Sequence, residues 1–374
     1  MKTLRTIAMV LIVLIGANSS FGQDINPAKS ISLPEDQYLH LGAPSEWWWH
    51  VGTLTSVDGR EFGFEINATG TPTSAISYAF AQIEISDVQK QRNYQKVNTL
   101  IPCPENWAQP DPAKPWFVRL PGSGANPLDG AIMMQSASDN PLDMTVNASF
   151  IDATGNTPCQ ILLNLRQEGE PLLVWGTGCT LVDPSGTTPL TRNNYYYSLT
   201  HLRASGNIII GNEVIAVTGL TWMDHEYGVF PMPSPGNPVV WLLQDIQLSN
   251  GLHLSNFTKF GVMPKQDIPI ESKATILFPN GESVYVDTTT TPMGLPFVSS
   301  KGVAYYLKYK VDIKSPRLTG IFEVSSQLDD QLFKDGAGAD IYEGVASCDA
   351  RLEGSDAIIS GTAWIEQNLG DNSH

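Results

Sequence analysis

The sequence predicts an all-β protein made of two barrels or sandwiches. Alternating apolar and polar residues recur along the whole chain, with almost no sustained helical periodicity. Glycine and proline are abundant, at 32 and 26 of 374 residues, which is typical of many short strands joined by turns. Asp-Gly and Asn-Gly pairs separate successive alternating runs, and such pairs are strong hairpin signals.

The first half of the chain is predicted to form a series of antiparallel hairpins. Residues 46–56 and 61–68 flank the Asp58-Gly59 turn, and residues 195–210 and 213–228 flank Gly211-Asn212. Between these two hairpins, residues 100–145 are proline-rich and polar, so we expect a long loop or covering segment there. Further strands are predicted at 77–86, 144–151, 159–167 and 172–179.

The second half repeats the hairpin pattern after a rigid, turn-rich segment at 229–238. We predict that this segment joins two domains, at 23–232 and 233–374. Hairpin turns are expected around Ser249-Asn250-Gly251 and Asn280-Gly281. The remaining strands are predicted within 303–313, 318–327 and 342–367.

The N-terminus has the layout of a secretory signal peptide. Lys2 and Arg5 precede an unbroken apolar run at 7–15, and small residues follow up to Gly22. Nine apolar residues are too few to span a bilayer. We therefore predict a signal peptide at 1–22 and a secreted or periplasmic mature protein without an integral membrane span, while an uncleaved N-terminal anchor remains the alternative.

The formal net charge is −16. Nucleic acids and anionic lipids bind clustered lysine and arginine, so this charge argues against both as partners. The four cysteines form no C-x-x-C pair, which leaves a zinc ribbon or thioredoxin-type site unsupported. An oxidising compartment permits two disulfides; Cys159 and Cys179 would pair first, although buried thiols remain equally open.

The stretch "EWWWHVGTL" places bulky residues on both faces of one strand. Glu46, Trp48 and His50 share one face, and Trp47 and Trp49 share the other. Such a strand suits a barrel wall that a second domain covers. Core packing accounts for the tryptophans, but a carboxylate and an imidazole on an aromatic wall need partners.

A second cluster, "TWMDHEYG", has three consecutive titratable residues between aromatic ones. On a strand, Trp222, Asp224 and Glu226 share one face, and His225 and Tyr227 share the other. A structural ion-pair network would gather the same residue types. Without H-E-x-x-H, G-x-S-x-G or G-x-G-x-x-G, the sequence predicts neither a metal nor a cofactor.

Five blocks together resemble the lipocalin-like carotenoid 1,2-hydratase (hydroxyneurosporene synthase) superfamily. They are "SEWWWHVGTL", "GREFGFE", "YYYSLTHLRASGNI", "VTGLTWMDHEYG" and "YEG…GTAWIEQ", and they span residues 46–366. They are most similar to its secreted bacterial branch, often labelled "predicted secreted hydrolase". The resemblance implies two lipocalin-like β-domains packed along a shared cavity. The superfamily includes alkene hydratases and cyclases that fold polyenes.

The resemblance also assigns residues. The acid-Trp-Trp start and the Asp-His-x-aromatic-Gly block match here, but Trp49 stands where a tyrosine is common and Tyr227 where a tryptophan is usual. No Tyr-x-Asp pair follows the next hairpin, where His253 and Asn256 lie instead. The matching positions are Glu46, Trp47, Trp48, Asp224, His225, Tyr227 and Gly228.

Together these patterns predict acid-assisted alkene chemistry on an apolar, isoprenoid or polyunsaturated substrate. A buried carboxylic acid can donate the proton, and aromatic faces can stabilise the carbocation. We assign Asp224 as proton donor and His225 as the group that orients or deprotonates water, with Glu46 as the third catalytic residue. The predicted substrate-binding residues are Trp47, Trp48, His50, Tyr197, Trp222, Glu226, Tyr227 and Trp241.

Other functions remain open from the sequence. A periplasmic carrier of a lipid or other hydrophobic ligand would use the same signal peptide and aromatic cavity. A cyclase would need the cavity but no acid, and hydrolysis rests on the branch label alone. For the enzyme, we expect the strands carrying Glu46 and Asp224 to lie side by side and to face one apolar cavity.

Overall fold

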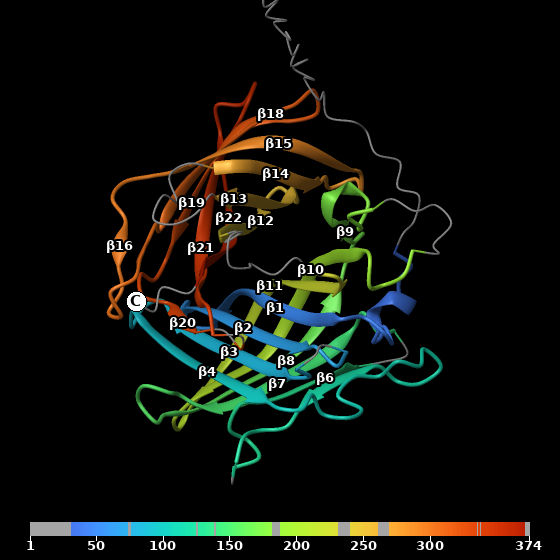
Figure 1. Cartoon of the computed structure of the whole chain (residues 1–374). Coiled ribbons are helices and arrows are strands. Elements are labelled where there is room, and N and C mark those ends of the chain that lie inside the picture. Colours follow the sequence, from blue (N-terminus) through green and yellow to red (C-terminus); the bar gives the residue numbers. More distant parts are fainter. Residues whose placement is uncertain are drawn as a thin grey trace, which may run out of the picture.

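The computed structural model describes residues 31–370, except 74–75, 125, 138–139, 182–187, 231–239, 261–268, 335 and 337. It confirms the predicted all-β fold. Two large antiparallel sheets make up almost all regular structure (Figure 1), together with two short 3-10 helices, Glu35–Gln37 and Val174–Gly176. The predicted signal peptide lies outside the described residues. Among those that are described, no helix is long and apolar enough to cross a membrane.

The first sheet contains the strands from β1 to β11, in the order β4-β3-β2-β1-β11-β10-β8-β7-β6-β5, and β9 pairs with β10. The long strands β1, β10 and β11 form its centre. The strands are β1 Ser45–Ser56, β2 Glu61–Gly70, β3 Ala79–Asp87, β4 Arg92–Leu100, β5 Phe117–Leu120, β6 Ala131–Ser136, β7 Met144–Ile151, β8 Pro158–Gln167, β9 Leu172–Leu173, β10 Asn194–Ile210 and β11 Glu213–Gly228.

The second sheet closes into an eight-strand barrel, because β19 pairs with both β18 and β21. Its order is β19-β18-β15-β14-β13-β12-β22-β21, with β20 beside β21 and a separate β16-β17 ribbon. The strands are β12 Val240–Leu248, β13 His253–Phe260, β14 Pro269–Leu277, β15 Ser283–Pro292, β16 Phe297–Val298, β17 Ala304–Tyr305, β18 Lys308–Lys314, β19 Thr319–Ser326, β20 Leu332–Lys334, β21 Asp340–Leu352 and β22 Ile358–Gly370.

The predicted hairpin turns join paired neighbouring strands. Gly59 and Gly281 have φ values of 84° and 85°, a left-handed conformation that glycine adopts without steric cost. The prediction of a long loop at 100–145 is wrong, because this segment contains β5, β6 and the start of β7. These strands are short, and Pro115 and Pro121 flank β5, so the turn signals obscured the alternating pattern.

The buried core consists of three apolar clusters, one within each half of the chain and one between the halves. One fills the interior of the first sheet and includes Trp48, and a second fills the closed barrel. The third joins the two sheets through Trp49, Trp222, Leu243 and Trp364. The two lipocalin-like units are therefore packed on each other through buried aromatic side chains.

The four cysteines are free thiols, and Cys159 and Cys179 are buried, so of the two alternatives left open by the sequence the structure has buried thiols and not the Cys159–Cys179 disulfide. Cys159 pairs with Ile210 at one end of β10, and Cys179 bridges to Tyr195 at the other. Fifteen residues of strand separate these partners, which corresponds to ~50 Å. A disulfide needs Cα atoms about 6 Å apart. The predicted linker at 229–238 lies outside the described residues from 231 onward, as does the predicted domain boundary between 232 and 233, so the boundary stays a prediction.

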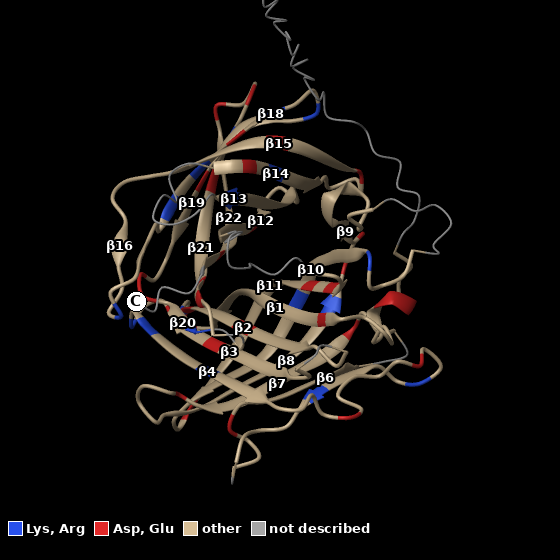
Figure 2. Cartoon of the chain, viewed as in Figure 1, with Lys and Arg blue, Asp and Glu red and all other residues tan. Residues whose placement is uncertain are grey.

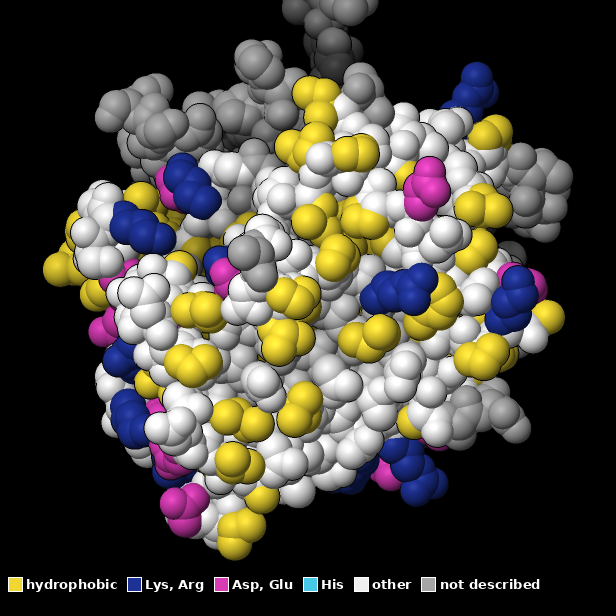
Figure 3. All heavy atoms as spheres, turned by 90° about the horizontal axis from the view of Figure 1, so that it is seen from below, with side chains coloured by type: hydrophobic (Ala, Val, Ile, Leu, Met, Phe, Trp, Pro, Cys, Tyr) yellow, Lys and Arg dark blue, Asp and Glu magenta, His cyan; other side chains and the backbone are white. Residues whose placement is uncertain are grey.

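Charged residues are spread over the described surface. Figure 2 shows basic positions dispersed among acidic ones, without a continuous basic strip on any described element. The space-filling view from below shows apolar side chains scattered among polar ones (Figure 3).

Candidate functional site

A cavity of about 520 Å³ lies between the two sheets. Strands of both sheets line it, among them β1, β2, β3, β10 and β11 from the first and β12, β13, β21 and β22 from the second. Its walls are mainly aromatic, with side chains of Trp47, Trp49, Tyr78, Phe80, Tyr196, Phe230, Trp241 and Phe257. This volume and apolar lining are typical of sites for small hydrophobic molecules.

The alternation along β1 decides which tryptophans reach the cavity. Trp47 and Trp49 line it. Trp48 points to the other face, into the core of the first sheet, where its ring stacks on His225 with centroids 4.4 Å apart. The two-faced strand predicted from the sequence is therefore confirmed, with one face on the cavity and the other on the barrel interior.

Asp224 on β11 faces the cavity and accepts three hydrogen bonds. Tyr196 Oη donates to one carboxylate oxygen at 2.5 Å, while Ser198 Oγ and Trp222 Nε1 donate to the other at 2.6 Å each. Burial raises the pKa of Asp224 to about 6, although the three hydrogen bonds oppose the shift. At neutral pH the group is therefore mostly a carboxylate that can accept a proton.

Glu226 lies two residues further along the same face and also lines the cavity. Asn194 Nδ2 donates to it. Burial raises the pKa of Glu226 well above its usual value; the hydrogen bond from Asn194 opposes this shift, and the charge on Asp224 adds to it. Burial therefore shifts Glu226 toward its protonated form. Two buried acids whose pKa values are both raised lie side by side on one wall of the cavity.

The opposite wall carries two more acids from the second sheet. Glu343 on β21 and Glu366 on β22 are register partners and both line the cavity. Trp364 Nε1 donates to Glu343 Oε2 at 2.8 Å, and Trp241 Nε1 donates to Glu366 Oε1 at 2.8 Å. Burial, followed by the charge on Glu65, raises the pKa of Glu343 well above its usual value.

Glu46 and His225 form a separate cluster on the inner face of the first sheet. Glu46 Oε1 accepts hydrogen bonds from His225 Nε2 and His40 Nδ1, both at 2.9 Å, and Oε2 accepts one from the His40 backbone N–H at 2.9 Å. His40 Nε2 also contacts Asp36 at 3.2 Å. Burial lowers the pKa of His40, but Glu46 and Asp36 outweigh it and raise the pKa to about 9.

Among the described residues, His40, Glu46 and His225 are also the group whose ligand atoms come close enough for a metal ion, within 4.8 Å of one another. Hydrogen bonds already join these atoms in pairs, and the ring of His40 stacks on Tyr227 with centroids 3.5 Å apart. These three residues form a charged hydrogen-bond network that joins the segment before β1 to the β1-β11 pair.

Residues 24–367 match the sequence pattern of the family described as AttH-like. The chain belongs to the AttH-like family. This family assignment agrees with the resemblance drawn from the five sequence blocks. No curated protein matches the chain by sequence.

Solved structures share the fold of this AttH-like chain at low sequence identity. A protein from Nitrosomonas europaea assigned as AttH has a TM-score of 0.68 at 20% identity, with 92% of this chain and 99% of that chain covered. Kievitone hydratase from Nectria haematococca has a TM-score of 0.63 at 17% identity, covering 93% and 97%. CghA has a TM-score of 0.53 at 12% identity, covering 88% and 90%. At these identities the likeness shows the lipocalin-like fold.

The predicted neighbourhood of the two motif strands is confirmed in this AttH-like chain, but the prediction that Glu46 and Asp224 face one cavity is wrong. β1 and β11 pair along their length, with Trp49 opposite Asp224 and Glu46 opposite Tyr227. Residues directly opposite each other on paired strands point to the same face of the sheet, and successive residues along a strand alternate between the two faces. Asp224 therefore shares a face with Trp49, while Glu46 shares the other face with Tyr227. His225 therefore cannot activate water beside Asp224, because it lies on the inner face with Glu46.

The structure divides the predicted substrate-binding residues in the same way. Trp47, Glu226 and Trp241 line the cavity, and Trp222 supports Asp224 from behind. The other four lie away from the cavity. His50 is fully buried and has no hydrogen-bond partner among the described residues, with its pKa lowered to about 3 by burial, and the inner face holds Trp48, Tyr197 and Tyr227.

Sequence reasoning missed most of the cavity residues, and four of them have a readable explanation. Tyr196 rather than Tyr197 faces the cavity, and the pairing of Tyr196 with Glu226 across β10 and β11 explains why. Trp49 was assigned to a strand face but not to the site. Glu343 and Glu366 lie within the late "YEG…GTAWIEQ" block, whose acids alternate with aromatic or apolar residues, and that pattern was the available signal.

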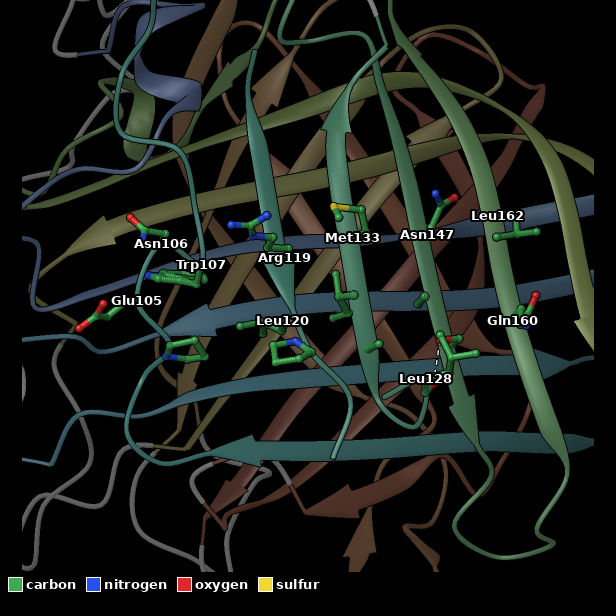
Figure 4. A pocket seen from close by; sticks show the side chains of 16 residues that line it. Glu105, Asn106, Trp107, Arg119, Leu120, Leu128, Met133, Asn147, Gln160 and Leu162 are labelled. Atoms are coloured by element: carbon green, nitrogen blue, oxygen red, sulfur yellow. Dashed lines mark hydrogen bonds between the residues drawn. The ribbon is translucent and has the colours of Figure 1, made fainter. Parts of the chain in front are cut away.

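A second hollow of about 590 Å³ lies on the solvent-facing side of β5–β8. Figure 4 shows its side chains, with Trp107, Arg119, Met133 and Leu162 among them. None of the sequence-predicted site residues lines it. The cavity between the sheets is therefore the candidate site.

Proposed function

We propose that this protein is an exported lipocalin-like enzyme that performs acid-assisted alkene chemistry, such as hydration or isomerisation, on an apolar isoprenoid or polyunsaturated substrate in the cavity between the sheets. One observation carries the proposal. Two buried acids, Glu226 with its pKa raised well above the usual value and Asp224 with its pKa raised to about 6, share one wall of a cavity that also presents aromatic rings. Export rests on the N-terminal sequence alone.

The chemistry follows from these two acids. The Glu226 carboxyl proton adds to one alkene carbon, and the other carbon becomes a carbocation. Facing aromatic rings can stabilise such a cation by about 2 kcal/mol each when water is excluded. A water oxygen then bonds to the cation and gives its extra proton to the Asp224 carboxylate, so that H and OH have been added across the double bond. Transfer of a proton from the neighbouring carbon to the Asp224 carboxylate instead yields an isomer, and in both cases the proton on Asp224 must return to Glu226 before the next turnover.

The ionised state of Asp224 gives this scheme a pH dependence. Asp224 accepts the proton only as a carboxylate, and its pKa is raised to about 6. Turnover should therefore rise as the pH increases through about 6, and it should fall at higher pH when Glu226 loses its proton. Tyr196, which donates to Asp224, helps to keep the carboxylate in place. The fold shared with kievitone hydratase supports hydration as the reaction class.

Three proteins decide the proposal: wild type, Glu226→Gln and the matched surface control Glu323→Gln on β19, whose side chain is 41% exposed. Each is incubated with acyclic isoprenoid alkenes in isotopically labelled water, and products are analysed by mass spectrometry. We expect Glu226→Gln to lose at least ~100-fold in turnover and to retain ligand binding, while Glu323→Gln matches wild type. A wild type that carries a hydrophobic ligand through purification without converting any alkene would instead indicate a carrier.

A further inference from the structure

Three N–H and O–H donors on aromatic side chains of the cavity wall already bind carboxylates. Trp49 Nε1 donates to Glu65 at 2.7 Å, Trp241 Nε1 to Glu366 at 2.8 Å and Tyr196 Oη to Asp224 at 2.5 Å. A single N–H or O–H proton forms one strong hydrogen bond. These three aromatic side chains therefore offer a ligand their ring faces but no free donor.

The cavity wall also offers a buried acceptor that has no hydrogen-bond partner among the described residues. Gln82 lines the cavity, its side chain is 1% exposed, and its Nε2 donates to Glu65 at 2.6 Å. Its Oε1 is buried and has no hydrogen-bond partner among the described residues, and the same holds for Glu65 Oε2. A buried acceptor without a donor costs about 1–3 kcal/mol. A ligand that brings donors would remove this cost.

The charge of the wall favours a positive ligand. Asp224, Glu226, Glu343 and Glu366 line the cavity, and no lysine, arginine or histidine appears among its described lining residues. Trp47 and Trp241 are 5.3 and 5.6 Å from Phe230, both in edge-to-face geometry, and these rings border the same cavity. Aromatic faces beside carboxylates bind organic cations, whereas an anion would find no counter-charge.

We propose that the natural ligand of this cavity carries a protonated amine at one end of its apolar body. This inference rests on the proposed function, because it assumes that the cavity is the ligand site. The amine lies against Glu343 and Glu366 on the wall formed by β21 and β22, and its N–H groups bind the carboxylates and the free Gln82 oxygen. The apolar body then extends toward Asp224 and Glu226 on β11, where the alkene reacts.

Binding of such a cation changes the protonation of the site. Burial raises the pKa of Glu343 well above its usual value and so favours the protonated form. A cation at hydrogen-bond distance favours the ionised form, so Glu343 releases a proton when the amine binds. The measured binding enthalpy should therefore depend on the ionisation enthalpy of the buffer. A neutral ligand of the same shape should show no such dependence.

The test uses three probes with one chain and different head groups: decylammonium, decanol and decanoate, each below its micelle-forming concentration. Isothermal titration calorimetry at pH 7 is run in two buffers of different ionisation enthalpy, on wild type and on Glu343→Gln. Glutamine can still accept the hydrogen bond from Trp364, so the variant should fold. Glu323→Gln on β19 is the matched control.

We expect wild type and Glu323→Gln to bind decylammonium at least ~10-fold more tightly than decanol, which corresponds to ~1.4 kcal/mol, with proton release, and not to bind decanoate. Glu343→Gln should lose most of this preference and keep its affinity for decanol. Equal binding of decanol and decylammonium to wild type, or tighter binding of decanoate, would overturn the amine inference and leave the proposed function intact. A preference retained in the Glu343→Gln/Glu366→Gln double variant would also overturn it. If no probe binds, both proposals fail.

Discussion

Replacement of Glu46 by glutamine separates a structural role of the inner cluster from a catalytic one. Glu46 is 1% exposed and accepts three hydrogen bonds, from His225 Nε2, His40 Nδ1 and the His40 backbone N–H, each at 2.9 Å. The glutamine side chain has one acceptor oxygen and turns an NH₂ group toward the remaining donors. It also leaves the charged His40 beside an uncharged partner.

The expected cost follows from these contacts. Removal of one partner of a buried ion pair costs about 3–5 kcal/mol. Because the His40 side chain is 17% exposed and retains its contact with Asp36, we take the lower end and expect the free energy of unfolding to fall by ~3 kcal/mol. The exposed pair of Glu323 with Arg351 supplies the control, since Glu323→Gln should cost less than ~1 kcal/mol.

The effect has a defined pH dependence. The pKa of His40 is raised from 6.5 to about 9 in the folded protein, so folding binds a proton between these values. This contribution to stability is fully present below about pH 6.5 and is lost as the pH rises through about 9. Glu46→Gln removes the main cause of the raised pKa. The stability difference between wild type and variant should therefore be largest near pH 6 and should shrink toward pH 10.

Urea unfolding at several pH values measures this difference, and NMR titration of the His40 ring reports its pKa directly. The Glu46→Gln variant should still bind ligand in the cavity, because the cluster of Glu46, His40 and His225 lies on the other face of the sheet. A Glu46→Gln variant as stable as wild type at pH 6 would refute the structural role. A stable variant that binds ligand but has lost all turnover would show instead that the cluster takes part in catalysis.

Two further predictions concern packing and buried charge. A Cβ atom on Gly63 would lie 2.5 Å from Val345 Cβ, so Gly63→Ala should lower the free energy of unfolding by ~1–3 kcal/mol. Val345→Gly removes that Cβ atom, so the double variant should lose less stability than the sum of the two single variants; additive losses in urea unfolding would contradict this. Burial raises the pKa of Glu84 to about 8, although hydrogen bonds from Asn93 and Ser86 oppose the shift. Unfolding free energy should therefore fall as the pH rises from ~4.5 to ~8, by up to ~1.4 kcal/mol per pH unit, and Glu84→Gln should flatten that slope.

Local sequence patterns were sufficient for most of the long strands and for the hairpin pairs at the predicted turns. The alternation along residues 46–56 and 213–228 put Trp47 and Trp49 on one strand face and Trp48 on the other. It likewise put Asp224 and His225 on different faces, as the structure has them. Turn pairs such as Asp58-Gly59 fixed hairpin partners, since a short turn leaves a strand only its neighbour to pair with. The short strands between proline residues at 100–145 were missed, because flanking turn signals outweighed a pattern only four to six residues long.

Only the tertiary structure decides which face of each strand lines the ligand cavity. A period of two separates the faces of a strand, but it does not tell the barrel interior from the contact with a second domain when both faces are bulky. Glu46 and His225 therefore belong to a buried network behind the cavity, while Asp224 and Glu226 line it. Glu343 and Glu366 join them from strands more than a hundred residues further along the chain. That meeting depends on how two sheets pack, which no local sequence pattern encodes.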